Sequence, residues 1–71
     1  MNWQRLIEIV QSETATPVSQ GSVFADLDMD SLDYLDMILE VEKAFNVTIP
    51  EDGLVFPTVQ DLGAWLQEHA A

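Results

Sequence analysis

Hydrophobic residues recur at helical spacing in separate stretches of this 71-residue chain, and each stretch predicts an amphipathic helix. The first helix is expected over residues 3–13, with Asn2 as its N-cap. Its inward face is expected to hold Trp3, Leu6, Ile7 and Val10. The last helix is expected to begin at Thr58, because Thr58 and Asp61 have the spacing of a capping box. Its inward residues are Val59, Leu62, Trp65 and Leu66.

The middle stretch has the clearest amphipathic pattern and predicts a helix over residues 31–45. At about 100° per residue, one side is apolar and is expected to face the core; it holds Leu32, Leu35, Ile38, Leu39, Val41 and Phe45. The opposite side is expected to face solvent and holds Asp33, Asp36, Met37, Glu40 and Lys43. Glu42 falls on the apolar side, and its carboxylate is expected to reach solvent near the helix end.

Between the helices the periodicity is lost. Residues 14–30 predict a long ordered loop, and its apolar anchors are Val23, Phe24 and Leu27. Residues 46–50 end the middle helix, and Pro50 can start a short helical turn at 51–55. The expected fold is therefore all-α, with residues 1–71 as one domain. It is a small four-helix bundle of three longer helices and one short helix, with a long loop between helices 1 and 2.

The charge of the chain limits the classes of molecule that it is expected to bind. The sequence has 13 acidic and 2 basic residues, which gives a net charge of −11. Nucleic acid is not an expected partner, because phosphate contacts need Lys and Arg. Proteins with basic patches are the expected partners, and the chain is expected to be a monomer. A hydrophobic content of 48% distinguishes it from disordered acidic tails.

The sequence also bears on location. No apolar run reaches the roughly 18 residues that a membrane-spanning helix needs. Met1 leads directly into polar residues, without the basic and apolar regions of a signal peptide. We therefore expect no membrane insertion and a cytoplasmic location. Met1 at the first position favours a free-standing protein.

The residue inventory argues against an enzyme, and no catalytic residue is expected. The only histidine is His69, which is expected to be an exposed terminal residue, and the chain has no cysteine. Ser31 is flanked in sequence by carboxylates rather than by an imidazole that could activate it. It therefore suits a substrate of another enzyme better than a nucleophile. The alternative interpretation is that Ser31 only N-caps the middle helix.

An alternating acidic motif precedes Ser31. Asp26, Asp28 and Asp30 resemble the first ligands of an EF-hand calcium loop. The later positions do not fit, because Ser31 stands where the loop needs Gly and Met37 stands where it needs Glu. We therefore expect no dedicated metal site, only weak screening of the carboxylates by divalent ions.

Two stretches together resemble the acyl carrier protein family: FADLDMDSLD at 24–33 and EKAFNVTIP at 42–50. A Thr-Val pair before the last helix, Thr58-Val59, extends the match. The resemblance implies a four-helix bundle whose Asp-Ser-Leu serine carries 4′-phosphopantetheine, transferred from coenzyme A by a phosphopantetheinyl transferase. Carried over by position, that serine is Ser31, and Asp30 and Leu32 complete the attachment motif.

The resemblance also implies how the chain works. The thiol of the arm would hold acyl intermediates as thioesters and deliver them to enzymes of fatty acid, polyketide or related lipid biosynthesis. The acyl chain would lie between the second and third helices, where the candidate lining residues, also expected in the core, are Leu35, Leu39, Ile49 and Leu54. Enzymes with basic patches would be steered to the acidic side of the middle helix, and the partner-binding residues are expected to be Asp33, Asp36, Met37 and Glu40.

The sequence departs from the family pattern beside the serine. Asp28 replaces the usual Gly, and Met29 stands where a small residue is common. Asp tolerates a positive φ better than most residues, so the fold is expected to persist and the choice of partners to change. A specialised acyl carrier is therefore as plausible as a housekeeping one. An aminoacyl or peptidyl carrier is the nearest alternative, and a non-covalent acidic adaptor for a basic partner is the alternative from another class.

Overall fold

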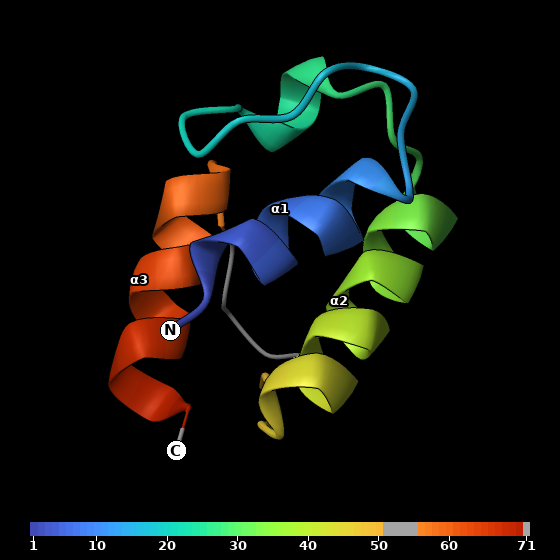
Figure 1. The fold of residues 1–71 in the computed structure, drawn as a ribbon. Coiled ribbons are helices and arrows are strands. Elements are labelled where there is room, and N and C mark those ends of the chain that lie inside the picture. The colour runs from blue at the N-terminus through green and yellow to red at the C-terminus, as the bar shows by residue number, and fades with distance from the viewer. Residues whose placement is uncertain (51–55, 71) are drawn as a thin grey trace.

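The computed structural model describes residues 1–50 and 56–70, and within them the regular structure is helical (Figure 1). The α-helices are α1 (Trp3–Gln11), α2 (Ser31–Phe45) and α3 (Val59–His69), and a 3₁₀ helix, η1 (Phe24–Asp26), lies in the long loop. Helix α1 lies between α2 and α3, and the loop crosses one end of the bundle (Figure 1). The all-α prediction is confirmed. The short helix predicted at 51–55 falls outside the described residues.

The first and last helices, α1 and α3, begin at the polar caps that the sequence predicts. Asn2 Oδ1 accepts a hydrogen bond from the backbone N–H of Arg5 at 3.1 Å, which satisfies one of the free N–H groups of α1. At α3, Thr58 Oγ1 accepts from Asp61 N–H at 3.0 Å, and the Asp61 carboxylate accepts from Thr58 N–H at 3.1 Å. The predicted capping box is therefore confirmed.

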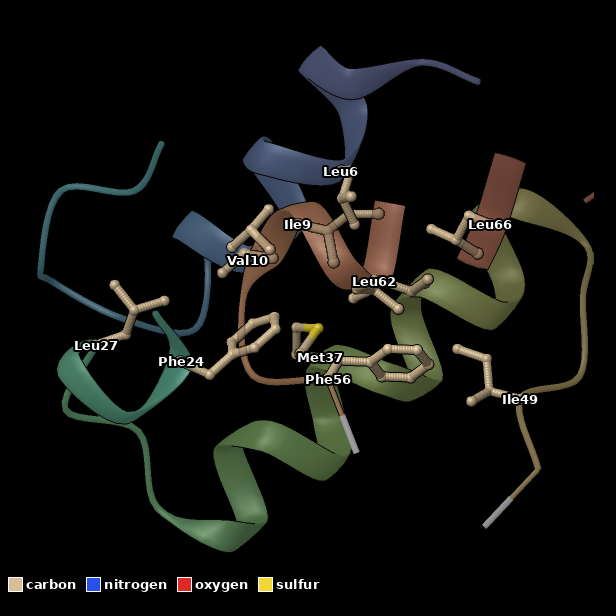
Figure 2. Packing of buried hydrophobic residues seen from close by; sticks show 12 residues of the cluster. Leu6, Ile9, Val10, Phe24, Leu27, Met37, Ile49, Phe56, Leu62 and Leu66 are labelled. Carbon is tan, nitrogen blue, oxygen red and sulfur yellow. The ribbon is translucent and has the colours of Figure 1, made fainter. Parts of the chain in front are cut away.

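One cluster of buried apolar side chains joins the helices, the loop and the connection before α3 (Figure 2). Its members are Leu6, Ile9, Val10, Phe24, Leu27, Met37, Val41, Ile49, Phe56, Val59, Leu62 and Leu66. Phe24 and Leu27 anchor the loop as predicted. Val23 was expected to do the same, but its side chain is 39% exposed. Backbone hydrogen bonds hold the segment around Val23 in place instead.

Backbone hydrogen bonds tie the long loop to the start of α3. Phe24 N–H donates to Pro57 O at 3.0 Å, and Val59 N–H donates to Ser22 O at 3.0 Å. The side chain of Gln11, at the end of α1, holds the other end of the loop. It donates to the carbonyls of residues 14 and 16 and accepts from the N–H of residue 18. These bonds replace the hydrogen bonds that a regular element would supply.

The side of α2 that faces the core differs from the predicted side. Met37 and Val41 are fully buried, whereas the leucines expected inside are exposed. Leu32, Leu35 and Leu39 are 72%, 49% and 50% accessible. The predictions that Met37 faces solvent and that these leucines face the core are therefore wrong.

The error has a geometric cause. At about 100° per residue, the apolar residues of α2 occupy more than half of its circumference. A chain of 71 residues buries a small core, so only part of this broad arc can be covered. Side chains of α1, α3, the loop and the connection form one cluster with Met37 and Val41 and cover this sector. Tyr34, Ile38 and Phe45 pack at its edge, half-buried.

Glu42 also departs from its expected role. Its half-buried carboxylate does not simply reach solvent but accepts a hydrogen bond from Ile49 N–H at 2.7 Å. The helix itself ends at Asn46, which adopts the left-handed conformation with φ 54°. The Glu42 side chain thereby holds the segment after this turn against α2, and Ile49 is placed in the core.

Gly63 permits the close approach of α1 to α3, because a Cβ there would overlap the indole of Trp3. We therefore expect Gly63→Ala to lower the free energy of unfolding by about 1 to 3 kcal/mol through overpacking, despite the better helix propensity of Ala. Urea unfolding followed by circular dichroism measures this. The matched control is Gly21→Ala, because a Cβ at Gly21 meets no neighbouring atom. Equal stability of the two variants would contradict the packing role.

Candidate functional site

Ser31 is the first residue of α2 and is exposed. The cap of this helix is Asp30, whose Oδ1 accepts from Asp33 N–H at 2.8 Å. Asp33 Oδ2 accepts from Asp30 N–H at 3.3 Å and completes a capping box. The alternative interpretation of Ser31 as the N-cap is therefore wrong. Because Asp30 caps the helix, the exposed Ser31 hydroxyl does not serve as a cap.

The backbone before Ser31 turns sharply at Asp28. This residue has φ 54°, in the left-handed region that favours glycine. The departure from the family glycine therefore keeps the positive φ, as expected for an Asp at this place. On either side of the turn, Leu27 is buried and Met29 packs half-buried against the core. These two anchors fix the turn that presents Ser31.

An acidic face lies along α2, and we define it as Glu13, Asp33, Asp36 and Glu40. Partial burial raises the pKa of Glu13, and the negative charges of Asp36, Asp33 and Glu40 raise it further. Glu13 was missed in the sequence because it lies in the turn after α1, far from α2 along the chain. No local pattern could have indicated it. Because its pKa lies above the ordinary value of 4.5, ionisation of Glu13 lowers the stability as the pH rises through that region.

The acidic face is hollowed and partly apolar. A surface hollow of about 510 Å³ is lined by Glu13, Asp36, Leu39, Glu40, Glu42 and Lys43. The exposed leucines of α2 continue this surface towards Ser31. Asp33, Asp36 and Glu40 lie close enough to Glu13 to raise its pKa, whereas Met37, which was predicted beside them, is buried.

The candidate acyl-lining residues do not share one buried wall. Ile49 lies in the core, whereas Leu35 and Leu39 lie on the surface of α2. Leu54 falls outside the described residues.

Two general features of the described residues bear on the site. No group of three or more His, Cys, Asp or Glu side chains in this part of the chain is placed to hold a metal ion. None of its helices is long and apolar enough to cross a membrane.

Comparison with known proteins assigns the family. The family model of the phosphopantetheine attachment site matches residues 4–66. The acyl carrier protein of Streptococcus pneumoniae is 38% identical over 71 residues, which cover 96% of this chain and 95% of that protein. The chain belongs to the acyl carrier protein family.

Other acyl carrier proteins show the same similarity. The acyl carrier protein of Zymomonas mobilis is 33% identical over 67 residues, which cover 93% of this chain and 86% of that protein. The chloroplastic acyl carrier protein 2 of Hordeum vulgare is 36% identical over 63 residues, which cover 82% of this chain and 49% of that protein. No solved structure matches the chain.

Membership of the acyl carrier protein family confirms two predictions. The chain is a carrier rather than an enzyme, and its cofactor is 4′-phosphopantetheine. Carriers of this kind are used by partner enzymes, including the transferase that attaches the arm.

The capping box separates the roles of the two residues at the start of α2. We expect Asp30→Ala to lower the free energy of unfolding by about 0.5 to 2 kcal/mol, because the N–H of Asp33 loses its partner. Ser31→Ala is the matched neighbour and should change stability by less than about 0.5 kcal/mol. Urea unfolding of both variants measures the difference. A larger loss for Ser31→Ala would show that the serine, and not Asp30, caps the helix.

Proposed function

We propose that this acyl carrier protein bears its 4′-phosphopantetheine arm on Ser31 and delivers acyl groups to partner enzymes. The observation that carries the proposal is the exposed Ser31 hydroxyl at the first position of α2, beside an Asp30 that already caps the helix. The residues 30–32 read Asp-Ser-Leu and lie inside the matched range 4–66. Residues 1–71 are proposed to form one carrier domain.

The start of α2 suits a phosphodiester. The backbone N–H groups of the first turn and the positive end of the helix dipole favour a phosphate at Ser31. Asp30 and Asp33 oppose the approach of an anion, so attachment needs a basic transferase and a divalent ion. Once bound, the arm supplies a thiol that holds an acyl group as a thioester. The protein supplies the anchor, the surface and the charge.

The partner-binding surface combines charge with apolar contact. Asp33, Asp36 and Glu40 steer enzymes with basic patches towards Ser31 and speed their encounter. Leu32, Leu35 and Leu39 lie exposed on the same helix, where they offer the apolar contact first assigned to Met37. The proposed partners are therefore the transferase and acyl-loading and acyl-transfer enzymes whose basic residues flank an apolar patch.

The cargo is proposed to be an acyl intermediate of fatty acid, polyketide or related lipid biosynthesis. The similar proteins are named acyl carrier proteins, which favours acyl over aminoacyl or peptidyl cargo. A non-covalent adaptor role has less support, because the matched family is defined by the attachment of phosphopantetheine. A cytoplasmic location and a monomeric state complete the proposal, and the net charge of −11 opposes self-association.

The attachment is tested by intact mass after incubation with coenzyme A, Mg²⁺ and a promiscuous phosphopantetheinyl transferase. The protein should gain the mass of one arm, and Ser31→Ala should gain none. Ser19→Ala, an exposed serine in the loop, is the control and should be modified fully. An unmodified parent protein, or a modified Ser31→Ala, would refute the assignment of Ser31.

The partner-binding surface is tested by charge reversal at Asp36. In low salt, Asp36→Lys should slow attachment of the arm by about tenfold, because steering by the acidic face is lost. Thermal unfolding should change little, since Asp36 is exposed. Glu68→Lys, on the exposed side of α3, is the matched control and should retain the parent rate. Equal rates for both variants would exclude the acidic face from recognition.

A further inference from the structure

Ser31 stands at a boundary on the surface of α2. Tyr34 lies about 60° from Ser31 around the helix in one direction, and Leu35 lies about 40° in the other. The structure buries the first of these sides and exposes the second, because Tyr34 is half-buried and Leu35 is 49% exposed. An arm on Ser31 therefore has two directions available to it, one past Tyr34 into the bundle and one along the leucines on the outside.

The Tyr34 side chain packs against the long loop. Its ring packs edge-on against Phe24 of η1, with centroids 5.4 Å apart and an interplanar angle of 89°. Burial raises the pKa of the Tyr34 phenol, and the nearby backbone of Phe56 acts in the opposite direction. The ring thus packs α2 against the loop, and the phenol lies near the connection before α3.

The side chains around Tyr34 are closely packed. Phe24, Met37 and Phe56 are 8%, 0% and 6% exposed and belong to the same cluster (Figure 2). An acyl chain entering from Ser31 would have to displace the Tyr34 ring from Phe24. On the other side of Ser31, Leu35 and Leu39 are one turn apart and already exposed. They can cover an acyl chain without any rearrangement.

We propose that Tyr34 closes the route from Ser31 into the bundle, so that acyl cargo lies along Leu35 and Leu39 on the outside of α2. The cargo is then a short or medium acyl group held in a form that partner enzymes can reach directly. This inference rests on the proposed attachment of the arm to Ser31. It makes Tyr34 a specificity-determining residue, because its size decides whether a longer chain can be buried.

The test compares the chemical accessibility of two cargoes on the complete modified protein. Butyryl and octanoyl thioesters are formed on the arm, and their cleavage by hydroxylamine is followed by intact mass. In the parent protein both should be cleaved at rates within about twofold. In Tyr34→Ala the lost ring leaves an apolar cavity that a chain can fill, and octanoyl cleavage should slow by about fivefold or more relative to butyryl.

Matched variants distinguish closure of the route by Tyr34 from a general loosening of the core. Tyr34→Phe keeps the ring and should behave as the parent protein. Val41→Ala removes buried volume from the same helix, farther from Ser31, and should leave the ratio of the two rates unchanged. Tyr34→Val is the second opening variant, and it is used where Tyr34→Ala fails to fold.

An independent readout is the ¹³C shift of the Met37 methyl group. It should be the same with butyryl and octanoyl cargo in the parent protein, and it should differ between them in the opened variant. A parent protein that protects octanoyl, or whose Met37 methyl responds to it, would overturn the proposal for Tyr34 while leaving the arm on Ser31 intact. Opened variants that show no protection would overturn it as well. A protein that takes up no arm at all would overturn both proposals.

Discussion

The small size of the core is the constraint on which the rest of this structure depends. A chain of 71 residues cannot cover the whole apolar arc of α2. The bundle buries the sector of Met37 and Val41 and leaves three leucines in solvent. Exposed leucines are a cost for an isolated protein, but they are useful to a carrier that meets several enzymes in turn. The same limit places Ser31 at the edge of the buried sector, where it is exposed to solvent.

The presentation of Ser31 depends on its neighbours rather than on the serine itself. Asp30 caps the helix, Asp28 supplies the positive φ of the preceding turn, and Leu27 anchors that turn in the core. Each task belongs to another side chain, so the hydroxyl is left for chemistry. The arrangement fits a protein whose function is to hold a tether in a fixed position while the reactions occur on its partners.

Charge shapes the same region in two opposing ways. In the proposed function the carboxylates of the acidic face attract basic enzymes, and they also repel one another, as the raised pKa of Glu13 indicates. A partner that brings Lys or Arg relieves this repulsion on binding, which favours encounter. Because surface charge pairs contribute little net affinity, the complex can also separate quickly. Rapid exchange is what a shuttle between enzymes requires.

The sequence by itself determined the three α-helices, the caps of α1 and α3, the anchors Phe24 and Leu27, and the family, because these depend on local spacing and on short motifs. It also indicated that Asp28 could take the place of a glycine. The tertiary structure alone decided which sector of α2 is buried, that Glu13 joins the acidic face, and that Glu42 holds the segment of Ile49. Periodicity fixes the angles between residues on one helix, but it does not say which part of a broad apolar arc the rest of the chain will cover. That choice depends on contacts between segments distant in sequence, and it is these contacts that bury Met37 and expose the leucines.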